Sequence, residues 1–241
     1  MTELHLQLND TILDIATGTA DIAILIARKF MELYPATDPS DSLFTPIIGL
    51  DPSEAMLRIG HIKILNQQLQ HHIELLLGDV QNMSQFESQY FSKVAMSFGL
   101  RNVQNRSLAL HEIFRVFKAN VPSQHPLPKL CILEFSRPSS GIIAHLAIAF
   151  IRYVLPTLGT LFTGNFHAYK HLSDSIMEFP LPSQLIDELQ SVGFNNCQYV
   201  DIFQDIVYLY TCVGSFEMNE TESGSDEYDF IAQSELNLNG L

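Results

Sequence analysis

The sequence predicts an α/β domain in which helices cover both faces of a parallel sheet. Short apolar runs alternate with helical segments along the chain, the order that crossover-connected parallel strands require. The 241 residues are 46% hydrophobic and 17% charged, which suffices for one sizeable core and excludes a disordered protein. The chain has no heptad or regular glycine repeat, which excludes the fibrous classes.

The first half of the chain alternates strands and helices. Each expected strand is a short apolar run followed closely by a glycine or an acid, and these runs are 12–16, 47–50, 73–77 and 94–98. The first run leads through the turn Thr17–Asp21 into a helix over 22–33. A linker rich in Pro, Ser and Asp, residues 35–46, comes before the second strand. Pro52 and Ser53 then start the second helix, because proline suits a first helical turn.

The second half continues this order and adds a hairpin. A helix is expected over 107–117 and a fifth strand over 130–135. A further helix starts at Pro182 and ends near Gly193. The last two apolar runs, 198–203 and 206–213, are close enough to pair as an antiparallel hairpin at one edge of the sheet.

The most hydrophobic stretch, residues 142–162, is about long enough to span a bilayer. Arg152 lies within it, and Pro156 and Gly159 break it. We therefore expect a buried or interfacial helix pair, with weak and mainly hydrophobic contact at the membrane surface.

Charge is distributed unevenly. All 13 Lys and Arg lie in residues 1–170 with 14 acids, whereas residues 171–241 hold 13 acids and no Lys or Arg. The chain has no basic patch of the kind that phosphate backbones require, so nucleic acid is not expected as a partner. Six acids between 217 and 229 predict a disordered tail, which divides the chain into a domain at 1–214 and a tail at 215–241.

The three cysteines, Cys131, Cys197 and Cys212, lie far apart and form no CxxC motif. They predict neither a disulfide scaffold nor a metal site, and they are interpreted as small core residues. The N-terminus has neither the basic nor the apolar region of an export signal, so a reducing, cytoplasmic location is expected.

Three expected strands end in residues that suit a ligand site, because ligands bind at the carboxyl ends of parallel strands. Gly18 permits a tight turn and close backbone approach, and the Asp51 carboxylate can accept hydrogen bonds from two ribose hydroxyls. Asp79 follows the third strand in the same way. Helix capping is the alternative role for Asp21 or Asp51.

The turn after the first strand favours one nucleotide ligand over another. A dinucleotide site needs G-x-G-x-x-G, whereas this turn has one glycine followed by Asp21. That acid would repel a pyrophosphate but not the sulfonium and ammonium groups of S-adenosylmethionine. The turn therefore favours a methyl donor over a nicotinamide cofactor.

Five segments are informative together: ILDIATGTAD at 12–21, SFGLRNV at 97–103, LEFSRP at 133–138, PTLGTL at 156–161 and YKHLSDSIMEFP at 169–180. In this order, they resemble the ubiquinone/menaquinone C-methyltransferase family of class I S-adenosylmethionine-dependent enzymes. The resemblance covers about residues 10–214. It implies a Rossmann-like fold with a mostly parallel seven-stranded sheet and an antiparallel C-terminal hairpin. The implied reaction methylates a ring carbon of a prenylated quinol. Naphthoquinol and benzoquinol members share these motifs, and demethylmenaquinol to menaquinol is the expected case.

The resemblance also implies roles for single residues. It places S-adenosylmethionine against Gly18, Thr19, Asp51, Asp79, Val80 and Ser97, with Thr19 at its methionine end, Asp51 at its ribose, and Asp79 and Val80 at its adenine. Arg101 and Asn102 are the expected catalytic residues at the substrate ring, where they could order a water as base. A surface salt bridge is the alternative for Arg101. His167 and Tyr169 are expected substrate contacts.

Two departures from the family pattern keep a second hypothesis open. Ala20 stands where the family has glycine, which is expected to narrow the approach to the donor. Eleven residues precede the first strand, whereas the family carries a helical N-terminal segment over its site. The alternative is therefore a donor-binding but inactive partner protein. The other expected partners are the inner face of the membrane and a second copy of the chain.

Overall fold

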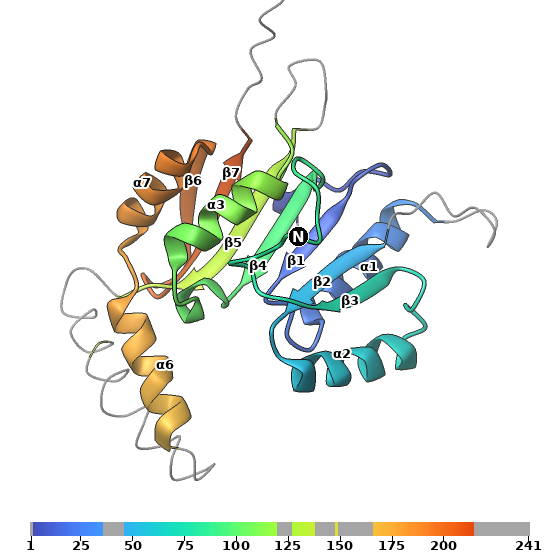
Figure 1. Ribbon diagram of the computed structural model, residues 1–241, viewed down its shortest axis with the longest axis horizontal. Coiled ribbons are helices and arrows are strands. Elements are labelled where there is room, and N and C mark those ends of the chain that lie inside the picture. The colour runs from blue at the N-terminus through green and yellow to red at the C-terminus, as the bar shows by residue number, and fades with distance from the viewer. Residues whose placement is uncertain (1, 36–45, 120–126, 138–147, 149–165, 215–241) are drawn as a thin grey trace, which may run out of the picture.

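A computed structural model describes residues 2–35, 46–119, 127–137, 148 and 166–214 (Figure 1). Its centre is a seven-stranded sheet of order β3-β2-β1-β4-β5-β7-β6. The strands are β1 (Ile12–Ile15), β2 (Ile47–Asp51), β3 (Ile73–Leu77), β4 (Lys93–Ser97), β5 (Lys129–Phe135), β6 (Asn195–Phe203) and β7 (Val207–Val213). The helices are α1 (Asp21–Leu33), α2 (Glu54–Asn66), α3 (Arg106–Val116), α6 (Phe166–Glu178) and α7 (Pro182–Val192), with short 3-10 turns η1 (Thr2–Leu4) and η2 (Leu100–Asn102).

The pairing of the strands confirms the predicted sheet. β1 to β5 pair in parallel, and β7 runs antiparallel between β5 and the edge strand β6. The last two strands therefore form the expected hairpin. All four residues of β1 are buried, which explains why its sequence is apolar except for Asp14 and does not alternate.

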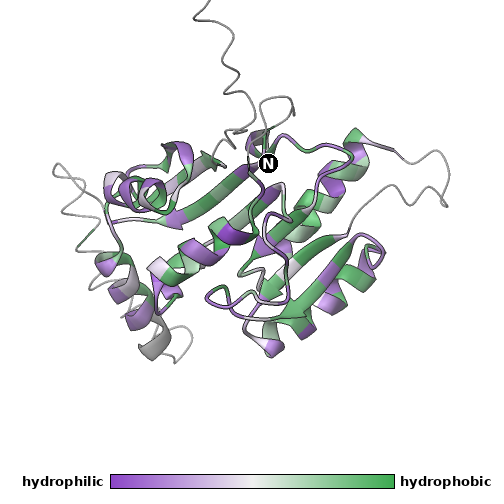
Figure 2. Ribbon diagram, turned by 45° about the horizontal axis from the view of Figure 1, so that its top comes forward, coloured by the Kyte–Doolittle hydropathy of each residue, from purple (hydrophilic) through white to green (hydrophobic). Residues whose placement is uncertain are grey.

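Helices cover both faces of the sheet, as the alternation predicts. α1 packs on one face with a cluster that includes Ile12 and Ile26, and α2 lies on the same side. α3 and α7 pack on the other face with a cluster that includes Leu13 and Leu110. Figure 2 shows the hydrophobic residues concentrated along the central strands, while polar residues mark the outer sides of the helices.

Specific residues mark the starts of three helices, α2, α3 and α7. Ser53 caps α2, because its hydroxyl accepts a hydrogen bond from the Met56 N–H at 3.3 Å. Asn105 caps α3 in the same way, and Pro182 is the first residue of α7. Pro52 thus precedes the capping residue, rather than lying in the first turn as expected.

The hairpin corrects the interpretation of two cysteines. Cys197 on β6 and Cys212 on β7 form a disulfide, with their Cα atoms 4.2 Å apart. An irregularity in the strand register between Asn195 and Gln198 accompanies this pairing, and sequence spacing alone did not indicate it. Cys131 is free and buried, as predicted for a small core residue.

The apolar stretch 142–162 lies outside the described residues except for position 148. Within the part of the chain that the structure describes, no helix has the length and apolar character needed to cross a bilayer. Helix α6, which follows this stretch, was not assigned from the sequence.

Candidate active site

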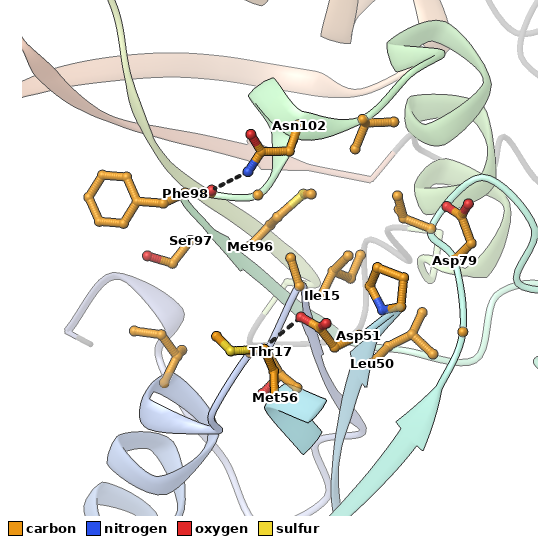
Figure 3. A pocket seen from close by; sticks show the side chains of 18 of the residues that line it. Ile15, Thr17, Leu50, Asp51, Met56, Asp79, Met96, Ser97, Phe98 and Asn102 are labelled. Carbon is orange, nitrogen blue, oxygen red and sulfur yellow. Dashed lines mark hydrogen bonds between the residues drawn. The ribbon is translucent and has the colours of Figure 1, made fainter. Parts of the chain in front are cut away.

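A pocket of about 720 Å³ opens at the carboxyl ends of β1, β2 and β4. The chain reverses its direction of progress across the sheet between β1 and β4, and such a reversal is where α/β sheets bind ligands. The volume falls within the range of small-molecule sites. In Figure 3, Asp51 lies between Ser97 and Asp79, so the walls of this pocket come from separate segments.

The turn after β1 forms the floor of the pocket. Ala16, Gly18 and Ala20 all adopt left-handed backbone conformations, with φ values of 55°, 57° and 65°. The expectation that Ala20 narrows the approach is not met, because its side chain is fully buried in the α1 core cluster. The pocket is lined by the neighbouring residues Thr19 and Asp21 instead.

Asp51 connects this turn to the end of β2. One carboxylate oxygen accepts a hydrogen bond from the Gly18 N–H at 2.8 Å, and the other accepts from the Ser53 N–H at 2.8 Å. Ser53, rather than Asp51, caps α2, so the capping alternative does not describe this acid. Each carboxylate oxygen keeps a second lone pair, so Asp51 can still accept hydrogen bonds from a ligand in the pocket.

Asp14 is a buried acid beneath the same turn. One carboxylate oxygen accepts from the Thr17 hydroxyl at 2.6 Å and from the Ala23 N–H at 3.1 Å. The other oxygen has no hydrogen-bond partner among the described residues. Burial raises the pKa of Asp14 to about 7, although the two hydrogen bonds oppose this shift. Asp14 therefore holds the turn at Thr17 and at Ala23, and burial makes its charged form unfavourable.

Asp21 does not carry an isolated charge. The Lys63 ammonium on α2 donates to its two carboxylate oxygens at 2.8 and 2.9 Å. The hydrogen bond from Lys63 lowers the pKa of Asp21, as does the one from Thr19. Asp21 therefore repels a pyrophosphate less than its place in the sequence suggests, because the Lys63 cation partly neutralises it.

The segment after β3 supplies the pocket wall farthest from Ser97. Gly78, Asp79 and Val80 line it, with Val80 buried and Asp79 exposed. An Asp79 carboxylate oxygen accepts a hydrogen bond from the Gln81 N–H at 2.9 Å. The structure thus brings Gly18, Thr19, Asp51, Asp79, Val80 and Ser97 to one pocket, as their predicted roles require.

The segment from Ser97 to Asn102 forms the opposite wall. Ser97, Phe98 and Asn102 line the pocket, whereas Arg101 is not among its described lining residues. The Arg101 guanidinium instead forms a buried ion pair with Glu134 on β5, with an N–O distance of 2.6 Å. The predicted alternative of a surface salt bridge is therefore replaced by a buried one.

The expected substrate contacts, His167 and Tyr169, lie in the first turn of α6. This helix contacts η2, which contains Arg101 and Asn102. The side chains of His167 and Tyr169 are outside the described residues, as is the motif at 156–161. Their predicted roles remain predictions.

Residues 3–213 match the model of the ubiE/COQ5 methyltransferase family. The chain belongs to this family. It is 36% identical over 203 residues to the ubiquinone/menaquinone biosynthesis C-methyltransferase UbiE of Geotalea daltonii, covering 84% of this chain and 78% of that protein. It is 32% identical over 200 residues to the demethylmenaquinone methyltransferase of Porphyromonas gingivalis, covering 83% and 74%.

A solved structure of a SAM dependent methyltransferase from Aquifex aeolicus shares the fold. Its TM-score is 0.57 at 14% identity, and the match covers 88% of this chain and 85% of that one. Membership of the ubiE/COQ5 family confirms the predicted enzyme class, and with it S-adenosylmethionine as the methyl donor. The alternative of an inactive partner protein is not favoured, because the relatives bear the names of enzymes.

Three residues around the pocket were not identified from the sequence. Asp14 and Glu134 each interrupt an apolar strand, and an acid inside a buried strand is a signal that could have drawn attention to them. Lys63 gave no such signal, because it lies on a largely exposed helix 42 residues away from Asp21.

Proposed function

We propose that this member of the ubiE/COQ5 family methylates a ring carbon of a prenylated quinol, converting demethylmenaquinol to menaquinol. The observation that carries the proposal is the pocket in which Gly18 and Asp51 face the segment Ser97–Asn102. It supplies one wall suited to a nucleoside and a second wall available to an acceptor. The substrate assignment is supported by the names of the relatives from Porphyromonas gingivalis and Listeria.

The residues present fit S-adenosylmethionine. Asp51 is 8% exposed and retains free lone pairs for the two ribose hydroxyls. Leu50, Val80 and Met96 add apolar surface for the adenine ring, with Asp79 at its edge. Thr19 and Gly18 in the turn would hold the methionine end. The bound donor supplies an electrophilic methyl group on a positively charged sulfur.

The acceptor side must align a ring carbon with that methyl group. Loss of a proton from the neighbouring ring hydroxyl makes this carbon nucleophilic. The carbon then forms the new C–C bond while the C–S electron pair stays on sulfur. The methylated ring carbon releases its proton, and the ring oxygen regains one, which restores the quinol. Asn102 lines the pocket, and in the proposed reaction it contacts the ring directly. Arg101, which is paired with Glu134, orders the same segment from behind it. Alignment of this kind supplies much of the rate enhancement in two-substrate reactions.

A methylation assay with labelled S-adenosylmethionine tests the proposal. Demethylmenaquinol is the acceptor, a prenylated benzoquinol is the comparison, and both products are identified by mass. We expect a mass gain of one methylene unit on the naphthoquinol. Donor binding without methylation of either quinol would support the inactive partner protein instead. Methylation of the benzoquinol alone would overturn the substrate assignment.

We further propose that the enzyme is cytoplasmic, that residues 1–214 form the methyltransferase domain, and that residues 142–162 give weak peripheral contact with the inner face of the membrane. The prenyl tail of the proposed substrate and the apolar composition of residues 142–162 support this contact. A second copy of the chain is the other proposed partner.

Cosedimentation with quinol-containing vesicles tests the membrane contact. High salt should not release the protein from the vesicles, whereas mild detergent should. Sedimentation velocity tests the dimer.

A further inference from the structure

We infer that Glu134 is a positioning residue for the methyl transfer. Acting through Arg101, it fixes the segment Phe98–Asn102 as the acceptor-side wall of the pocket. The inference rests on the proposed function, but it concerns a residue outside the pocket lining, and it can fail while that function holds.

Glu134 uses both carboxylate oxygens to bind its surroundings. Its side chain is 0% exposed on β5. One oxygen accepts from the Arg101 guanidinium at 2.6 Å and from the Phe135 N–H at 2.8 Å. The other accepts from the Arg101 backbone N–H at 3.2 Å. Glu134 therefore holds both the backbone and the side chain of Arg101.

Arg101 passes this constraint to the pocket wall. The guanidinium nitrogen that meets Glu134 also donates to the Phe98 carbonyl oxygen at 2.6 Å. The guanidinium carbon lies 5.1 Å and 5.8 Å from the ring centroids of Phe135 and Phe98. Both hydrogen bonds come from one guanidinium nitrogen, so what a lysine ammonium would not reproduce is the planar guanidinium beside the two rings.

The segment held in this way is strained. Phe98 has a φ of 55°, which is unfavourable for an aromatic residue and requires support from its surroundings. Its carbonyl oxygen also accepts from the Asn102 side-chain amide at 3.5 Å, as Figure 3 shows. Ser97, Phe98 and Asn102 all line the pocket, so release of Arg101 would move them together.

The energetics favour a positioning role over a stabilising one. Burial raises the pKa of Glu134, although the Arg101 charge opposes this shift. A buried ion pair adds little net stability compared with a well-packed apolar pair, because both charges lose their hydration. What the pair provides is a defined geometry for Phe98–Asn102, and a displacement of about 1 Å at a reacting centre costs on the order of 100-fold in rate.

The test uses the full chain with Glu134→Gln, Arg101→Lys and the double variant. Glu188→Gln is the matched control, because it breaks another Arg–Glu pair, with Arg106, between α3 and α7. Calorimetry gives the Kd for S-adenosylmethionine, steady-state kinetics give kcat and the quinol KM, and melting gives Tm. We expect Glu134→Gln and Arg101→Lys each to lower kcat by about 10- to 100-fold, with donor Kd changed less than about 3-fold. The double variant should be no slower than the slower single variant, because the two residues act as one unit. Glu188→Gln should leave kcat unchanged.

Two results would overturn the inference. One is a Glu134→Gln enzyme with a lowered Tm but an unchanged kcat, which would show a purely structural role. The other is a double variant in which the fold-loss of kcat equals the product of the losses in the two single variants. If Glu134→Gln does not fold, the kcat of Arg101→Lys decides in its place. An inactive wild-type enzyme that binds donor would instead contradict the proposed function.

Discussion

The ammonium nitrogen of Lys63 lies 2.6 Å from the hydroxyl oxygen of Thr19, and this contact joins α2 to the turn after β1. The same nitrogen forms an ion pair with Asp21, whose carboxylate also accepts from the Thr19 hydroxyl at 2.8 Å. Thr19 and Asp21 line the pocket, whereas Lys63 is not among its described lining residues. Lys63 therefore supports the proposed donor site from outside it.

Replacing Lys63 by methionine should weaken the binding of S-adenosylmethionine by about 3- to 10-fold, because the Thr19 side chain loses its external partner. Lys29→Met is the matched control, since Lys29 also pairs with an acid and its side chain is 36% exposed, against 35% for Lys63. Calorimetry measures the affinity of both variants for S-adenosylmethionine. Equal affinities for the two variants would exclude a role for Lys63 in donor binding.

Asp51→Ala should weaken donor binding by about 1.5–3 kcal/mol, the usual scale for hydrogen bonds to a charged group. The substitution removes the proposed ribose acceptor, and it also frees the Gly18 and Ser53 N–H groups. Glu54→Ala is the control, because Glu54 is an exposed acid close by that pairs with Arg58. An unchanged calorimetric affinity for Asp51→Ala would contradict the assignment.

Asp14→Asn should make the stability of the protein less dependent on pH. Because burial raises the pKa of Asp14 to about 7, the folded state favours the protonated acid. This contribution to the free energy of unfolding is complete below the pKa of an aspartate in the unfolded chain, which is about 4. It is lost as the pH rises through 7. The wild-type Tm should therefore fall more between pH 5.5 and pH 8 than the Tm of Asp14→Asn. Parallel pH profiles would refute this prediction.

Gly99→Ala should destabilise the fold by about 1–3 kcal/mol and slow methyl transfer. A methyl group at this position would lie 2.4 Å from the Ala16 side chain, which has no freedom to move away. At Gly78 the same change meets the end of the Leu50 side chain at 2.6 Å, which can rotate. Chemical denaturation should show a larger loss for Gly99→Ala than for Gly78→Ala.

Most of the fold was predictable because local patterns agree with the tertiary structure. Apolar runs of four to seven residues became the central strands, and the hairpin formed where two such runs lie close together. The donor-side residues were also predictable, because parallel strands bring their carboxyl ends to one edge. Gly18, Asp51 and Asp79 each follow or end such a strand.

The features that were missed depend on side-chain direction. Arg101 follows the pocket-lining Ser97 in sequence, yet its guanidinium turns back toward Glu134, and no pattern in the segment indicated this. Lys63 reaches Asp21 only because α2 packs close to the turn, where a side chain at Gly60 would meet Ala20 at 3.3 Å. The cysteine pairing likewise depends on a local strand irregularity.

The order of the strands divides the two proposed binding tasks along the chain. β1, β2 and β3 lie on one side of β4 and precede it in sequence, while β5, α6 and the hairpin follow it. The proposed donor contacts come from the first half except for Met96 and Ser97 on β4, and the proposed acceptor contacts all come from the second. A chimera joined in the segment between β3 and β4 would therefore inherit its quinol preference from the second parent and its cofactor affinity largely from the first. Selection on the quinone of a cell could act on one half of such a gene while leaving the other nearly untouched.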